Sequence, residues 1–305
     1  MPFGPDTTTD EVLAGIDLTG RTVLVTGASA GLGVETVKAL AGVGARVIGA
    51  VRDRAKAEKV LEGVAVELVD LDLADLDSVR SCAKEVLALT DELHVLVNNA
   101  GVMACPLMRT AQGFELQLGT NHLGHFLLTQ LLTDLLVASA PARIVNVSSR
   151  GHLRGGMRWQ DPHYADESSY EKWRAYAQAK TANVLFTVGL EKRLADRGVH
   201  ALALHPGVII TELSRHLTAD DMTRLAASMP TGALVRKEVS AGAATQVWAA
   251  TSPELEGRGG LYLEDCQVAG PTPGDGSGGY ADWAVDPDEA EKLWLWSEEQ
   301  IAEVS

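Results

Sequence analysis

Two residues of the sequence, Tyr176 and Lys180, combine types and spacing that could move a proton. They lie in the stretch RAYAQAKTANVLF, which is typical of a helix, and residues four apart share one helix face. A phenol with an ordinary pKa of about 10 is a poor base, and a neighbouring ammonium group stabilises its phenolate. The tyrosine could then take a proton from an alcohol or return one to a forming alkoxide. Because the same spacing also occurs on plain surface helices, this interpretation depends on the rest of the chain.

A glycine-rich turn, TGASAGLG, could bind a phosphate group. It follows an apolar run and opens a helical stretch, so free backbone N–H groups and the positive end of the helix dipole would face a pyrophosphate. Glycine lets the backbone turn tightly and approach a ligand without a clash from a Cβ atom. Such turns can need glycine for steric reasons alone, but the position between the first strand and the first helix favours a dinucleotide. The predicted contacts are Gly27, Ser29, Gly31, Leu32 and Gly33.

Apolar runs alternate along the chain with segments of helical pattern. The predicted strands are residues 21–27, 45–51, 64–73, 93–101, 142–149, 199–207 and 259–264. The predicted helices are residues 32–41, 53–63, 78–89, 114–138 and 171–195. This alternation predicts an α/β fold: a single doubly wound Rossmann-type domain, with a mostly parallel seven-stranded sheet and helices on both faces. Ligands of such sheets bind beyond the carboxyl ends of the strands.

The predicted domain organisation has one main part. Residues 1–17 are an N-terminal extension, and residues 18–268 form the Rossmann-type catalytic domain. Two segments that do not fit the alternation, about 150–169 and 208–235, are predicted lids over the ligand site. Residues 269–305 are predicted to form a loop and a C-terminal helix packed on the same domain.

Composition excludes several classes of protein. The 305 residues carry a formal net charge of −15, which disfavours nucleic acid as a partner because a polyanion would be repelled. No apolar run is long enough for a membrane span, and the polar, acidic start lacks the pattern of a secretory signal. The cysteines, Cys82, Cys105 and Cys266, show no metal-ligand spacing and suit a reducing compartment. We therefore predict a cytoplasmic protein with no bound metal.

The motifs together resemble a known family. The glycine-rich turn, NNAG at residues 98–101, a serine after the fifth strand, Tyr-x-x-x-Lys and HPG after the sixth strand stand in the order found in short-chain dehydrogenases/reductases. The stretches GFELQLGTNHLGHFLLTQLL and RIVNVSSRGH are similar to the retinol-dehydrogenase-like branch of that family. The resemblance covers residues 18–251 and implies a Rossmann-type oxidoreductase.

The resemblance implies four catalytic residues. Tyr176 would carry the proton, while Lys180 would lower the pKa of Tyr176 and bind the nicotinamide ribose. Ser149 would polarise the substrate oxygen, with Ser148 as the alternative because strand alternation turns only one of them toward the cleft. Asn121, in the long helix before the fifth strand, would help to hold Lys180 through a water molecule.

The resemblance also implies how the chain would hold a nicotinamide cofactor. After the third strand, Asp72 and Leu73 would contact the adenine, with Asp70 as the alternative. The other implied contacts, to the ribose groups, the nicotinamide and the phosphates, are Asn99, Ala100, Gly101, Tyr176, Lys180, Pro206, Gly207, Ile209 and Thr211.

The choice between NADP(H) and NAD(H) depends on the end of the second strand. An acidic residue there favours NAD by binding the ribose 2′-hydroxyl, but this chain has Val51 followed by Arg52. A guanidinium group can pair with a 2′-phosphate, so we favour NADP(H), with NAD(H) possible. Asp53 could turn toward the ribose instead, and Arg54 could either add to the positive field or face solvent.

The predicted function is an NAD(P)(H)-dependent oxidoreductase that interconverts an alcohol and a carbonyl. An apolar set in the second lid predicts a mainly apolar substrate. The set is Ile209, Ile210, Leu213, Leu217, Met222, Leu225 and Met229. The alternatives are a non-catalytic dinucleotide-sensing protein of the same fold and a light-driven double-bond reductase. The helices at residues 114–138 and 171–195 form subunit contacts in much of the family, which implies a homo-oligomer, with a dimer favoured.

Overall fold

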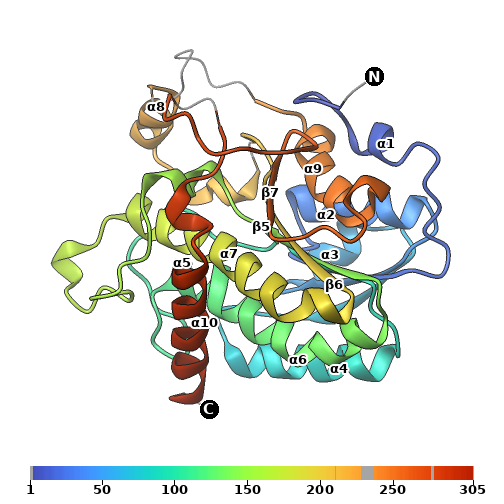
Figure 1. Ribbon diagram of the computed structural model, residues 1–305, viewed down its shortest axis with the longest axis horizontal. Coiled ribbons are helices and arrows are strands. Elements are labelled where there is room, and N and C mark those ends of the chain that lie inside the picture. The colour runs from blue at the N-terminus through green and yellow to red at the C-terminus, as the bar shows by residue number, and fades with distance from the viewer. Residues whose placement is uncertain (1–2, 210, 228–235, 276–277, 305) are drawn as a thin grey trace.

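A single mixed sheet organises the computed structural model, which describes residues 3–209, 211–227, 236–275 and 278–304 (Figure 1). The strand order is β3-β2-β1-β4-β5-β6-β7-β8, the doubly wound order in which the direction reverses beside β1. The strands are β1 (Thr22–Thr26), β2 (Arg46–Val51), β3 (Val66–Asp70), β4 (Val95–Asn98), β5 (Ala142–Val147), β6 (Val199–His205), β7 (Leu261–Glu264) and β8 (Gln267–Val268). Strands β1 to β7 pair in parallel, which confirms the predicted fold class.

The prediction of seven strands is wrong by one. Strand β8 has two residues and pairs antiparallel with β7, with Leu263 opposite Val268. The residues between the two strands, Asp265 and Cys266, have φ of 53° and 56°. Two successive left-handed residues make the tight hairpin turn that matches strand twist. A strand of two residues has no hydrophobic period, so the sequence pattern could not reveal it.

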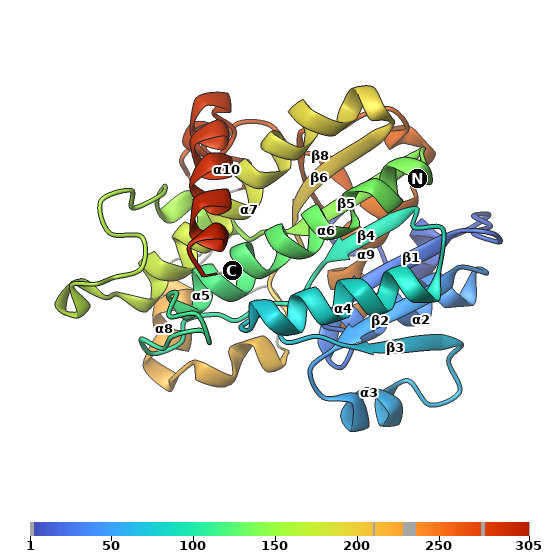
Figure 2. The ribbon, with the colours of Figure 1, turned by 90° about the horizontal axis from the view of Figure 1, so that it is seen from below.

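Helices cover both faces of the sheet, and each face has its own apolar core. One face carries α4 (Leu76–Leu89), α6 (Gly124–Ala138) and α7 (Lys172–Leu194), as Figure 2 shows. The other carries α1 (Thr9–Val12), α2 (Gly31–Gly42), α3 (Arg54–Val60) and α9 (Val239–Thr251). The sequence analysis did not predict α9. Residues 241–250 are buried on every side, so the segment has no polar face to give a helical period.

The C-terminal helix α10 (Pro287–Ala302) packs across α6 and α7. Trp294 of α10 lies against Phe126 of α6, with ring centroids 5.0 Å apart. Lys192 of α7 forms an ion pair with Glu291 at 2.9 Å. Helix α10 therefore covers part of the surface of the two helices that the resemblance associates with subunit contacts. The dimer stays a prediction, and any contact through α6 and α7 has to accommodate α10.

A buried histidine joins α10 to the segment before α6 and makes folding stability depend on pH. His122 is fully buried, and its Nε2 lies 2.8 Å from Oγ of Ser297. That hydroxyl donates to the carbonyl of Leu293 at 2.7 Å, so it accepts from the imidazole N–H. Burial lowers the pKa of His122 to about 3. The unfolded chain therefore binds this proton first as the pH falls below about 6.5, and the folded state loses stability.

We expect the variant His122→Gln to be less sensitive to acid than the parent, because glutamine keeps a donor for Ser297 but has no site that titrates. Between about pH 7.5 and about pH 5, protonation of His122 in the unfolded chain should lower the free energy of unfolding of the parent by about 2 kcal/mol. The measurement is the free energy of unfolding in urea at both pH values, for both proteins. Equal losses in the parent and the variant would show that His122 does not set the acid limit.

Candidate active site

A cleft of about 850 Å³ opens at the carboxyl ends of the parallel strands. The turns after β1 to β6 all contribute to its lining. The residues that the sequence analysis favoured as catalytic or cofactor contacts all line this cleft, with the exception of Asn121. The structure thus brings together residues that lie far apart in the sequence, because parallel strands present the same end to one edge of the sheet.

The glycine-rich turn is shaped to leave helix α2 open toward the cleft. Gly27 has a φ of 73°, which disfavours any residue with a side chain. A Cβ atom on Gly33 would lie 2.2 Å from the carbonyl oxygen of Gly27, so only glycine fits. Ala30, the residue before α2, makes no side-chain cap, and Thr211 lies against Gly31. The first N–H groups of α2 therefore remain available to an anionic ligand.

Tyr176 and Lys180 lie one turn apart on α7, and Ser149 follows β5 beside them. Both α7 side chains are buried, with 5% and 3% of their surface exposed. Tyr176 shares a hydrogen bond with the Ser149 side chain. The Lys180 ammonium donates to the carbonyl of Val147 at 2.9 Å and lies 5.7 Å from the centre of the Tyr176 ring. The three side chains converge on the floor of the cleft.

Burial is the main influence on the pKa values of Tyr176 and Lys180. Burial raises the pKa of Tyr176 to about 12, and the hydrogen bond with Ser149 opposes that rise. Burial also lowers the pKa of Lys180 to about 7. In the protein chain by itself, removal from water disfavours the charged form of both groups. The lowering of the Tyr176 pKa by Lys180 stays a prediction.

The structure distinguishes the two serines after β5. The hydroxyl of Ser148 donates to the backbone carbonyl of Lys180 at 2.7 Å, and its backbone N–H pairs with Leu204. The hydroxyl of Ser149 accepts from the N–H of Gly151 at 3.0 Å and shares the bond with Tyr176. Ser148 thus fastens β5 to α7, whereas Ser149 points to the tyrosine.

Asn121 lies behind the cleft wall, within a π-helical turn, Gly119–Leu123, that interrupts the predicted long helix. Its side chain pairs with both backbone groups of Val102, at 2.8 and 2.9 Å. A Cβ atom on Gly101 would lie 2.9 Å from Asn121 Oδ1 and 3.7 Å from the Lys180 ammonium. Asn121 and Lys180 therefore approach each other across a glycine. Such π-turns occur often at functional sites.

Two further residues that the sequence analysis missed, Thr26 and His125, tie this region together. His125 Nδ1 lies 3.0 Å from the carbonyl of Asn121, and its Nε2 lies 2.9 Å from Oγ1 of Thr26. That oxygen also accepts from the backbone N–H groups of Asn99 and Ala100, each at 3.0 Å. The ring stays neutral because burial lowers the pKa of His125 to about 4. Both residues stood in the quoted motifs, but only their partners reveal the chain of contacts.

The sequence left open whether Asp70 or Asp72 would contact the adenine, and the positions of the two side chains favour Asp72. Asp72 and Leu73 line the cleft. Asp70 is exposed and forms an ion pair with Arg54 at 3.1 Å. Its carboxylate is therefore engaged on the outer surface, at the end of the edge strand β3.

The charged neighbours of Arg52 are bonded to other protein groups. Asp53 caps α3 by accepting from the N–H of Lys56 at 3.0 Å. Arg54 binds Asp70 and donates to the carbonyl of Leu68 at 2.9 Å. Lys56, which the sequence analysis did not consider, lines the cleft together with Arg52 and forms an ion pair with Glu212. The second strand therefore ends at a corner of the cleft that is lined by Arg52 and Lys56, the basic corner, with the carboxylates of Asp53 and Glu212 beside them.

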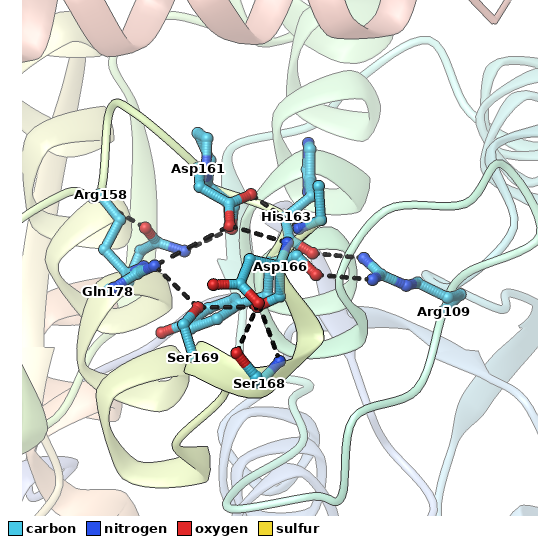
Figure 3. A network of polar contacts seen from close by, with 11 residues as sticks. Arg109, Arg158, Asp161, His163, Asp166, Ser168, Ser169 and Gln178 are labelled. Carbon is cyan, nitrogen blue, oxygen red and sulfur yellow. Dashed lines mark hydrogen bonds and ion pairs between the residues drawn. The ribbon is translucent and has the colours of Figure 1, made fainter.

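Only the beginning of the first predicted lid lines the cleft, through Arg150, Gly151, Leu153 and Arg154. The rest is held in a polar network outside it (Figure 3). Arg109 donates to the carbonyls of His163 and Tyr164. Gln178 of α7 accepts from the backbone N–H of Arg158 and donates to the carbonyl of Pro162, each at 2.8 Å. Most of this segment is thus a fixed wall of the fold.

The second predicted lid contributes apolar side chains to the other side of the cleft. Ile209, Leu213 and Met222 line it. Lys172, at the start of α7, forms an ion pair at 2.6 Å with Asp221 of α8 (Ala219–Ala227). Of the remaining apolar set, Leu217 is outside the lining, while Ile210, the Leu225 side chain and Met229 fall outside the described parts of the chain.

Comparison with known proteins identifies the family. The model of the short chain dehydrogenases matches residues 21–222. Short-chain dehydrogenase/reductase prx1 of Penicillium rubens is 44% identical over 284 residues, covering 90% of this chain and 83% of that protein. Human retinol dehydrogenase 14 is 41% identical over 302 residues, covering 92% of this chain and 86% of that protein. A solved structure of an uncharacterized Mycobacterium paratuberculosis protein is 36% identical, with a TM-score of 0.75 over 97% of this chain and 98% of that one.

The chain therefore belongs to the short-chain dehydrogenase family, whose members are NAD(P)-dependent oxidoreductases. The similarity to retinol dehydrogenase 14 confirms the resemblance to the retinol-dehydrogenase-like branch. Within residues 3–209, 211–227, 236–275 and 278–304, no helix combines the length and the apolarity needed to span a membrane. The same residues contain no group of three or more His, Cys, Asp or Glu placed to hold a metal ion.

Proposed function

We propose that this protein interconverts an alcohol and a carbonyl on a mainly apolar substrate by nicotinamide-dependent hydride transfer. The observation that carries the proposal is the convergence of Ser149, Tyr176 and Lys180 on the floor of a cleft whose other end is the uncapped start of α2. A proton carrier beside an anion cradle is the arrangement that this reaction needs.

The residues of the cleft fit a dinucleotide cofactor. The turn at Gly27 and Gly33 leaves room that a Cβ atom would fill, and the N–H groups of α2 would hold the pyrophosphate. The nicotinamide supplies a hydride at its C4 when it is bound. The residues that would hold the cofactor are Gly27, Ser29, Gly31, Leu32, Gly33, Arg52, Asp72, Leu73, Asn99, Ala100, Gly101, Tyr176, Lys180, Pro206, Gly207, Ile209 and Thr211.

The side chains on the cleft floor would handle the proton. A pKa of about 12 keeps Tyr176 as a phenol at neutral pH, so it would donate its proton to the oxygen of a carbonyl under reduction. Ser149 would hydrogen-bond the same oxygen. Lys180 would bind the ribose next to the nicotinamide, and Asn121 would support Lys180 from behind.

NADP(H) is the cofactor that the basic corner supports. Arg52 and Lys56 line the cleft, and two carboxylates lie beside them: Asp53 caps α3, and Glu212 pairs with Lys56. Arg52 would therefore supply the main attraction for a 2′-phosphate. NAD(H) remains possible.

The substrate end of the cleft supports an apolar molecule. Its lining there includes Met103, Leu153, Trp173, Leu213 and Met222. The name of the human relative, a retinol dehydrogenase, points in the same direction. The cytoplasmic location and the homo-oligomer, with a dimer favoured, stay predictions.

A substrate panel tests the proposed function. We expect turnover of NADP(H) with apolar aldehydes, ketones or alcohols, because burial of their apolar surface against the apolar lining of the cleft is favourable. The readout is the absorbance of the reduced cofactor at about 340 nm. The control set consists of small, highly charged carbonyl compounds, which should be poor substrates. A clear preference for the charged set would contradict the apolar assignment. Cofactor binding without any turnover would favour a dinucleotide-sensing protein, and turnover that requires light would favour a double-bond reductase.

A further inference from the structure

A histidine outside the proposed catalytic set lies directly under the turn that carries Ser149. His152 is in the short turn η2 (Arg150–Arg154), and its side chain is fully buried. Its Nδ1 lies 2.6 Å from the carbonyl oxygen of Ser149, and its Nε2 lies 3.3 Å from the backbone nitrogen of Ala281. A carbonyl only accepts and a backbone N–H only donates, so these partners assign the proton to Nδ1 and the lone pair to Nε2.

The backbone that His152 holds is in contact with the proposed proton carrier. A Cβ atom on Gly151 would lie 2.9 Å from Cε1 of Tyr176 and 3.4 Å from Oγ of Ser149. The N–H of Gly151 also donates to that Oγ at 3.0 Å. The position of the turn at residues 149–152 therefore determines how the Ser149 hydroxyl meets the tyrosine.

His152 connects this turn to three distant elements. Its carbonyl accepts from Oγ1 of Thr181, the residue after Lys180, at 3.3 Å, and from the indole N–H of Trp283 at 3.3 Å. Its ring packs against Tyr262 of β7, with ring centroids 4.8 Å apart. Burial keeps the ring neutral by lowering the pKa of His152 to about 4, which preserves the acceptor that Ala281 needs. The contacts reach α7, β7 and the segment before α10.

We propose that His152 is a positioning residue: it clamps the Ser149 carbonyl to the backbone of Ala281 and thereby aims the Ser149 hydroxyl at Tyr176. This role rests on the proposed function. It gives the segment before α10 a part in the reaction, because Ala281 is the fixed point against which the turn is held.

Nδ1 of the ring also lies 3.4 Å from the hydroxyl of Tyr262. Three variants separate the contacts at Nδ1 from the hydrogen bond at Nε2. His152→Leu removes all of them, whereas His152→Asn keeps a donor near the Nδ1 position and His152→Gln keeps an acceptor near the Nε2 position. We expect the leucine variant to lose about 10- to 100-fold in kcat, since a small misplacement of a catalytic group costs this much. Its KM for the cofactor should stay within about twofold of the parent, because the phosphate cradle is untouched. The asparagine variant should recover most of kcat and the glutamine variant should recover less.

The control is His94→Leu, which removes another histidine that holds a backbone group. His94 accepts from the N–H of Thr22 at 3.0 Å, at the amino ends of the strands and therefore at the opposite edge of the sheet from the cleft. Thermal midpoints of all the variants show whether the folded state is retained. A kcat for His152→Leu within about twofold of that for His94→Leu would overturn the proposal, as would equal losses in the asparagine and glutamine variants. A parent without turnover on the whole panel would instead contradict the proposed function itself.

Discussion

Replacement of Tyr176 by phenylalanine should lower turnover by about 10²- to 10⁴-fold, because the ring stays in place but the proton carrier is lost. Tyr176 is buried at the cleft, one helical turn before Lys180, and is hydrogen-bonded to Ser149. The measurement is kcat on the best substrate of the panel, together with the dissociation constant of the cofactor. Cofactor affinity should be retained, since the glycine-rich turn and the basic corner are unchanged.

The matched control for this variant is Tyr164→Phe. Tyr164 is also fully buried, but it lies outside the cleft, and its hydroxyl has no partner among the described residues. Removal of that hydroxyl should leave both stability and turnover near those of the parent. Near-normal turnover in Tyr176→Phe would refute the proposed mechanism, and an equal loss in both variants would indicate a general effect on the fold.

Replacement of Arg52 by alanine should lower the preference for NADP(H) over NAD(H) by about 10- to 100-fold, the size expected when a hydrogen bond to a charged group is removed. The effect should fall on NADP(H) alone, because NAD(H) has no phosphate for the guanidinium to bind. The measurement is kcat/KM with both cofactors, in the parent and in the variant.

The neighbouring arginine provides the control for this prediction. Arg54 carries the same charge two residues away, but it is bound to Asp70 and to the carbonyl of Leu68. Arg54→Ala should therefore leave the cofactor preference unchanged. If the parent prefers NAD(H), or if the two variants shift the preference equally, Arg52 is not the selector.

The sequence by itself determined the order of the seven parallel strands, the helices between the first six of them, and the edge where the site lies. Parallel strands such as β1, β4 and β5 are continuous apolar runs, which local pattern reveals directly. The glycine-rich turn and the four-residue spacing of Tyr176 and Lys180 are also local features. The strand order then follows from right-handed connections, and it brings the strand ends to one edge.

Only the tertiary structure decided which residues are committed elsewhere. Ser148 is bonded to the Lys180 carbonyl because β5 packs beside α7. Asp70 is paired with Arg54, which belongs to another element. The network from Thr26 through His125 to Asn121 joins residues 99 positions apart, which no local pattern can show. The same holds for His152, whose partner Ala281 lies 129 positions away. The charge state of Tyr176 also followed from packing, because burial changes a pKa through the surroundings and not through the adjacent sequence.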